Sequence, residues 1–165
     1  MESNNRFAPP GANVDDASAD GSGGARENAP ALWNPNAAAN WSVLFTPMFG
    51  AWLHMKNWQA LGQPAKAAEA RHWVIGSALL IFCLSLLSVL APGNLLADFP
   101  RLIGLALLFG WYFASGRPHA RFVAKRFGRD YPRKGWGRPL AAVVLGIVAY
   151  IVVVTLIALV ARNAP

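Results

Sequence analysis

The side chains in this 165-residue sequence that are best suited to chemistry are its three histidines, His54, His72 and His119. Imidazole binds iron, copper and zinc, so histidines that face each other on neighbouring helices could hold haem or a metal ion. The spacing gives little support, because the sequence has no HxxxH pair, no CxxC pair and a single cysteine. We therefore predict no cofactor and no metal ligand, and keep a haem- or metal-binding redox subunit as a distant alternative.

Motifs for enzymatic chemistry are missing from the sequence. It contains no GxSxG, Walker or HExxH motif. Its apolar stretches also hold no Asp, Glu, Lys or Arg, the residue types that mark proton relays and ion-coupled carriers inside a membrane. We predict that the protein is not an enzyme and has no catalytic residues, and that a transporter or channel subunit is the runner-up function.

Basic residues are concentrated in the segment 116–139, which holds eight Lys and Arg. Those spaced four apart, which a helix would place in one stripe, are Arg117, Arg121, Lys125 and Arg129. The apolar residues on the adjoining surface would be Phe122, Val123 and Phe127. A helix of this kind lies on a membrane surface with its cations on anionic headgroups. The alternative is that these charges only fix the orientation of the chain.

Small and hydroxyl side chains recur at helical spacing in two apolar stretches. Ser42, Thr46 and Gly50 follow one another at every fourth residue, and Ala142 and Gly146 do the same near the C-terminus. Small residues let membrane helices approach closely, so we predict that these five positions mediate helix packing.

The composition shows which elements must carry these residues. Hydrophobic residues make up 55% of the chain and charged residues only 14%, against roughly 25% charged in an average soluble domain. The stretches without any Asp, Glu, Lys or Arg are 28–55, 73–97, 102–116 and 139–161. A helix needs about 20 apolar residues to cross a bilayer. We predict an all-α, polytopic helical membrane protein with four spans, or three spans plus a re-entrant or interfacial segment.

The first apolar stretch, 41–53, is interrupted by Pro47. We favour one kinked helix from Asn36 or Asn40 to Leu61, over a re-entrant or surface-lying hairpin, because the uncharged run around Pro47 is long. Gly62 fits the position just after that helix.

The remaining helices are bounded by proline and glycine. Pro64 fits the first turn of a second helix that reaches Ala91. A third helix opens at 98–100 and stops near Gly116, and the last span is 140–161.

The domain organisation follows from composition and charge. Residues 1–36 are rich in Gly, Ala, Asn and Pro, which predicts a disordered tail before a helical bundle over 37–165. Because Lys and Arg favour the cytoplasmic side, we place the basic loop 116–139 there. If all four spans cross, both termini lie outside. We expect no nucleic-acid partner, because the basic residues lie between apolar spans.

The residues Trp33-Asn34-Pro35, Asn40-Trp41-Ser42 and Phe45-Thr46-Pro47, followed by Tyr131-Pro132-Arg133-Lys134, resemble a group of small uncharacterised bacterial inner-membrane proteins. The resemblance covers most of 33–140 and implies a multi-pass protein of the bacterial inner membrane, but no chemistry. We predict a non-enzymatic membrane scaffold or accessory subunit. Its partners would be lipid with anionic headgroups, and another membrane protein or a second copy of itself.

Overall fold

The computed structural model of the protein describes residues 29–91 and 100–163, and these form an all-α structure. Its helices are α2 (Pro35–Phe45), α3 (Pro47–Ala60), α4 (Pro64–Leu90), α6 (Pro100–Trp111), α7 (Arg117–Phe127) and α8 (Gly137–Asn163). A π-helical turn, η1 (Tyr112–Gly116), connects α6 to α7. The expected tail therefore lies outside the described residues up to position 28. Positions 29–36, which we assigned to it, are packed: Ala29 and Leu32 are buried.

The first apolar segment is a helical hairpin rather than the single kinked helix that we favoured. Asn34 caps α2 by accepting hydrogen bonds from the backbone amides of Asn36 and Ala37. Thr46 ends α2 with a φ of 101°, and Pro47 starts α3 at its first turn. Proline disfavours a helical conformation in the residue before it, so the chain turns at Thr46. The ends of the hairpin meet again, because the Asn57 side chain bonds the backbone of Trp33.

Gly62 connects α3 to α4 as the sequence predicted. Its φ is 66°, a left-handed conformation that glycine adopts without steric cost, and Pro64 occupies the first turn of α4. The expected start of the third helix at 98–100 falls mainly outside the described residues. Its expected stop near Gly116 is wrong, because the chain continues through η1 into α7. Pro118 lacks the amide needed for regular helical bonding, which explains the π turn just before it.

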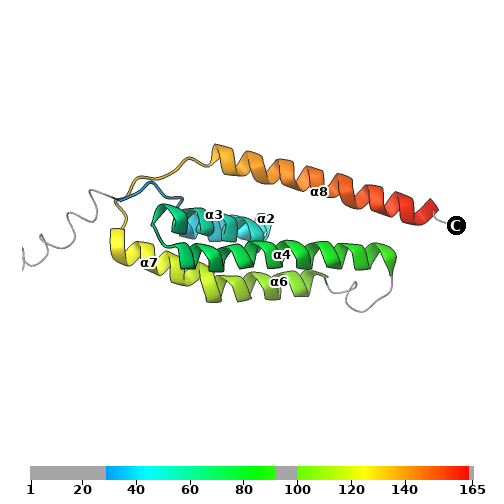
Figure 1. Ribbon diagram of the computed structural model, residues 1–165, viewed down its shortest axis with the longest axis horizontal. Coiled ribbons are helices and arrows are strands. Elements are labelled where there is room, and N and C mark those ends of the chain that lie inside the picture. Colours follow the sequence, from blue (N-terminus) through cyan, green and yellow to red (C-terminus); the bar gives the residue numbers. More distant parts are fainter. Residues whose placement is uncertain (1–28, 92–99, 164–165) are drawn as a thin grey trace, which may run out of the picture.

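The long helices lie side by side, with α4 between α6 and α8, and the hairpin of α2 and α3 packs at one end (Figure 1). That end also carries Gly62, α7 and the segment 128–136, and we call it the basic end. By length and composition, two helices could cross a membrane: α4 and α8, whose most apolar windows have mean hydropathies of 2.4 and 3.1. Almost none of the residues in these windows is buried.

The buried residues are concentrated at the basic end instead. One cluster joins Leu32 to Val123 and Phe127 of α7, and a second joins Phe49 and Leu53 to the aromatic residues around them. Gly50 permits the closest approach, since a Cβ there would collide with the Ser42 Oγ and with the ring of Trp111. The hairpin and α6 therefore meet at Gly50.

This close contact predicts the effect of adding one methyl group. We expect Gly50→Ala to lower the free energy of unfolding by about 1–3 kcal/mol, because Ser42 and Trp111 must both move to admit the Cβ. The matched control is Gly76→Ala on α4, where a Cβ meets nothing within 4 Å. Thermal unfolding in mild detergent measures both variants. Equal midpoints for the two would contradict the close contact at Gly50.

Candidate functional site: the basic end

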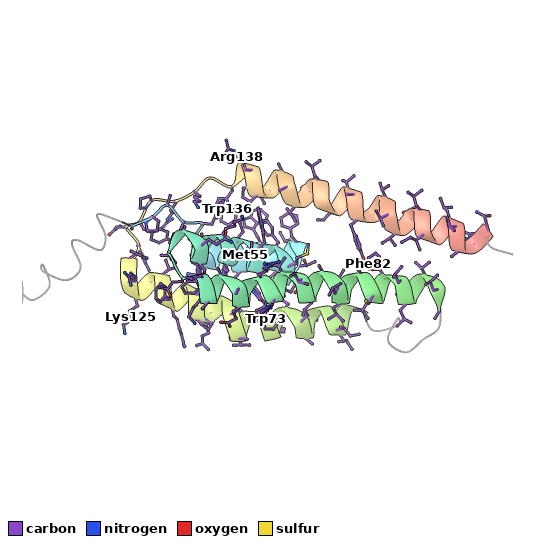
Figure 2. All side chains as sticks on the ribbon, in the orientation of Figure 1. Met55, Trp73, Phe82, Lys125, Trp136 and Arg138 are labelled. Atoms are coloured by element: carbon purple, nitrogen blue, oxygen red, sulfur yellow. The ribbon has the colours of Figure 1, made fainter. Side chains whose placement is uncertain are left out.

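Arg117, Arg121 and Lys125 lie on α7 and are exposed. Arg129 is exposed as well, but it lies beyond the end of α7 at Phe127, after a reversal at Gly128 with a φ of 65°. In Figure 2, Lys125 projects away from the bundle. The structure thus presents three of the four predicted lipid-surface residues from one helix and the fourth from the following turn.

The apolar side of α7 faces the protein interior, not the surroundings. His119, Val123 and Phe127 recur at every fourth residue and are all buried. Our expectation that Val123 and Phe127 provide an apolar surface beside the cations is therefore wrong for these two residues. Phe122, the third of the predicted apolar residues, is half-buried against Trp58, and the cations of α7 are exposed.

The segment after α7 is attached to the residues that precede α2. Leu32 and Arg133 form a parallel β-bridge, in which the Leu32 amide donates to the Pro132 carbonyl and the Lys134 amide donates to the Leu32 carbonyl, both at 2.9 Å. The Lys134 ammonium also lies 4.5 Å from the centre of the Trp33 ring. This attachment places residues 29–34 at the same end of the molecule as the basic segment. The four-span threading that we expected would put residues 29–34 on the side opposite to that segment, which does not fit this arrangement, whereas the end of α8 at Asn163 lies at the far end as expected (Figure 1).

A buried polar cluster of Asn57, His54 and His119 lies inside the basic end. Asn57 is fully buried; its side-chain carbonyl accepts from the Trp33 amide at 3.0 Å, and its NH2 group donates to the Trp33 carbonyl at 2.8 Å. The same NH2 group lies 3.4 Å from the His119 Nε2. Asn57 therefore joins the chain before α2 to α3 and α7. Sequence reasoning missed this residue, although the spacing of His54, Asn57 and Trp58 already placed them on one face of a helix.

His54 and His119 come together in this cluster, and His72 does not. The two buried rings stack with their centres 4.4 Å apart, whereas His72 is exposed on α4. The His54 Nε2 lies 3.4 Å from the Pro35 carbonyl, which can only accept, so that nitrogen carries the proton. The Nδ1 atoms of both rings are buried without a partner among the described residues. In the part of the chain that the structure describes, no group of three or more His, Cys, Asp and Glu is placed to hold a metal ion.

Burial controls the protonation of both rings. It lowers the pKa of His54 from 6.5 to about 4, although the hydrogen bond with Pro35 acts in the opposite direction. It also lowers the pKa of His119, and the neighbouring His54 lowers it further. Both rings are therefore neutral at pH 7 and act as uncharged packing and hydrogen-bonding groups.

The predicted packing residues have different surroundings. Ser42 and Gly50 are buried between α2 and α3, and the Ser42 hydroxyl donates to the Ala38 carbonyl at 2.8 Å. Thr46 lies in the turn of the hairpin. Ala142 and Gly146 are exposed on α8 and line a groove of about 780 Å³ between α8, α4 and the hairpin.

The lowered pKa of His54 predicts how stability depends on pH. Because the folded state resists protonation, stability is complete above the unfolded pKa of 6.5 and is lost as the pH falls towards 4. The loss amounts to about 3 kcal/mol for 2.5 pH units. We expect the unfolding midpoint to fall between pH 6.5 and 4.5. The fall should be smaller in His54→Gln and unchanged in His72→Gln; an equal fall in all three proteins would contradict this assignment.

Comparisons with known proteins found no relative of the chain. No protein-family model, no curated protein and no solved structure matches the chain. The resemblance to small bacterial inner-membrane proteins stays a prediction, and the function has to follow from the geometry of the basic end and the groove.

Proposed function

We propose that the chain is a non-enzymatic scaffold or accessory subunit of a membrane, which rests its basic end on anionic lipid headgroups. The observation that carries this proposal is the division of α7 into two sides. Its cations Arg117, Arg121 and Lys125 are exposed, while His119, Val123 and Phe127 anchor the helix in the interior. Cations that are fixed in this way can contact a charged surface without a further cost of folding.

The apolar surface of the bundle supports a membrane location. Large hydrophobic side chains are exposed along the whole of α8, among them Leu145, Val152 and Val160. Soluble monomers seldom expose apolar patches of this extent, and hydrocarbon is the solvent that suits them. We place α4 and α8 as spans, with α6 and η1 as a shorter third one, and the hairpin of α2 and α3 as a re-entrant segment.

The charge distribution supports an orientation for these spans. The segment 116–139 holds eight basic residues and one acidic residue, Asp130. Basic segments beside a span favour the cytoplasmic side. In this arrangement the basic end faces the cytoplasm, and the hairpin enters and leaves the membrane from that side. By the resemblance in its sequence, the membrane is the bacterial inner membrane.

Three charge-removing substitutions test the docking of the basic end. In vesicles of phosphatidylcholine with increasing phosphatidylglycerol, we expect the unfolding midpoint of the full chain to rise. Each cation near an anionic surface contributes about 1 kcal/mol, so removing three should remove several degrees of that rise. The variant is Arg117→Gln with Arg121→Gln and Lys125→Gln, and circular dichroism on heating provides the measurement.

The matched control for this experiment is Arg162→Gln, which removes an exposed cation at the far end of α8. In the control, the unfolding midpoint should still rise with phosphatidylglycerol nearly as much as in the wild type. In the wild type, 0.5 M salt should suppress this rise in the midpoint. If the triple variant responds to phosphatidylglycerol as strongly as the wild type, the cations of α7 serve only to orient the chain.

A further inference from the structure

An apolar groove lies beneath the basic end, between the tip of the hairpin, α4 and α8. It has a volume of about 780 Å³. Its walls are formed by side chains such as Phe49, Trp52, Ala78, Phe82, Val143 and Ile147, and Thr46 and Tyr150 are its polar lining residues. Figure 2 shows Phe82 projecting from α4 into the space between α4 and α8. The contact of the basic end with lipid headgroups, proposed above, does not involve this groove.

Contacts of α8 with the hairpin and with α4 border the groove on either side of Gly146. Towards the basic end, Trp136 and Leu140 pack on the aromatic cluster that contains Trp41. At the far end, the hydroxyls of Tyr150 and Ser85 are hydrogen-bonded across α8 and α4. Between these contacts α8 presents Gly146, where a Cβ would meet nothing within 4 Å. The groove is therefore bordered by these contacts along α8 and is open to the surroundings on its remaining side.

The walls indicate what fills the groove. Apart from Thr46 and Tyr150, the walls offer ordered water almost no polar partners. A volume of this size is typical of small-molecule sites with mainly hydrophobic walls. One turn of a helix, 5.4 Å long and 10–12 Å wide, takes roughly 500 Å³. The groove therefore has room for fewer than two turns, so a transmembrane helix does not fit inside it. A flexible hydrocarbon chain meets both requirements.

Two cations lie about one helical turn from lining residues, on the side of the basic end, and favour an anionic headgroup. Lys56 follows the lining residue Trp52 by one turn of α3, and Arg71 precedes the lining residue Val74 by about one turn of α4. Both cations are exposed and lie towards the basic end. A phosphate beside them would leave its acyl chain pointing down the groove.

We propose that this groove is a binding site for one anionic phospholipid, with an acyl chain between α8, α4 and the hairpin and its phosphate at Lys56 and Arg71. The proposal rests on the membrane location argued above, and it adds a ligand held by the protein to the headgroups on which α7 rests. A second copy of the chain and a neutral lipid are the competing occupants that the experiment must separate.

Native mass spectrometry on the full chain in mild detergent tests the site. The delipidated protein is offered phosphatidylglycerol or phosphatidylcholine in mixed micelles, and the lipids retained per chain are counted. We expect the wild type to retain one phosphatidylglycerol under conditions that remove phosphatidylcholine. Gly146→Leu, which fills the groove, should lower the retained lipid at least fivefold. Ala78→Leu fills it from α4 and should act in the same direction.

The matched control is Ala141→Leu, which adds the same side chain at an exposed position on the opposite side of α8. It should retain lipid like the wild type. Lys56→Gln with Arg71→Gln should lower the preference for phosphatidylglycerol over phosphatidylcholine to about one. Circular dichroism of each variant confirms that its helices form.

Three results would overturn the proposal. One is equal retention by the wild type and both groove-filling variants. Another is equal retention of the two lipids by the wild type, which would show that the groove binds an acyl chain whatever the charge of its headgroup. The third is a dimer without lipid that Gly146→Leu dissociates, which would make a second copy the occupant. If α7 still responds to anionic vesicles in such a case, the proposed function stands without this site; if the chain does not enter membranes, both fail.

Discussion

The side-chain amide of Asn57 is the interaction on which the arrangement of the basic end depends. It satisfies the amide and the carbonyl of Trp33 and reaches His119, so one fully buried group connects the chain before α2, the second arm of the hairpin and α7. A buried amide has to be paired, because leaving its partners unsatisfied costs about 1–3 kcal/mol for each group. This requirement closes the hairpin at the basic end and brings Leu32 beside Arg133. The cations of α7 face outward because the opposite side of the same helix is fixed there.

Polar and apolar groups are distributed as the membrane location proposed above requires. The buried residues include Ser42, His54, Asn57 and His119, whereas the surface of α8 consists largely of exposed Val, Leu and Ile. In water this distribution would be unfavourable, because it leaves a large apolar surface exposed to solvent. In hydrocarbon the apolar side chains lose nothing by exposure, and helix association depends on close packing and on polar contacts. The contact at Gly50 and the hydrogen bond between Ser85 and Tyr150 are of these two kinds.

The sequence predicted the local features and missed the long-range ones. The turn at Gly62, the start of α4 at Pro64 and the long apolar α8 follow from backbone geometry and hydropathy, and the structure confirms them. The hairpin was the less favoured alternative, because uncharged length alone cannot distinguish a kink at Pro47 from a reversal. The pairing of Asn57 with Trp33 joins residues 24 positions apart, and no local pattern contains it. The groove depends likewise on where α8 lies against α4, which periodicity does not fix.

The side of the membrane on which residues 29–34 lie is the decisive property to measure, because the β-bridge at Arg133 ties them to the basic segment. Single cysteines at Ala31, Arg129 and Asn163, in a chain carrying Cys83→Ser, would be treated in intact cells with a membrane-impermeant maleimide. All three positions are exposed. We expect labelling at Asn163 in intact cells, and labelling at Ala31 and Arg129 only after the cells are permeabilised. Labelling of Ala31 in intact cells while Arg129 stays protected would contradict the hairpin and restore the four-span threading.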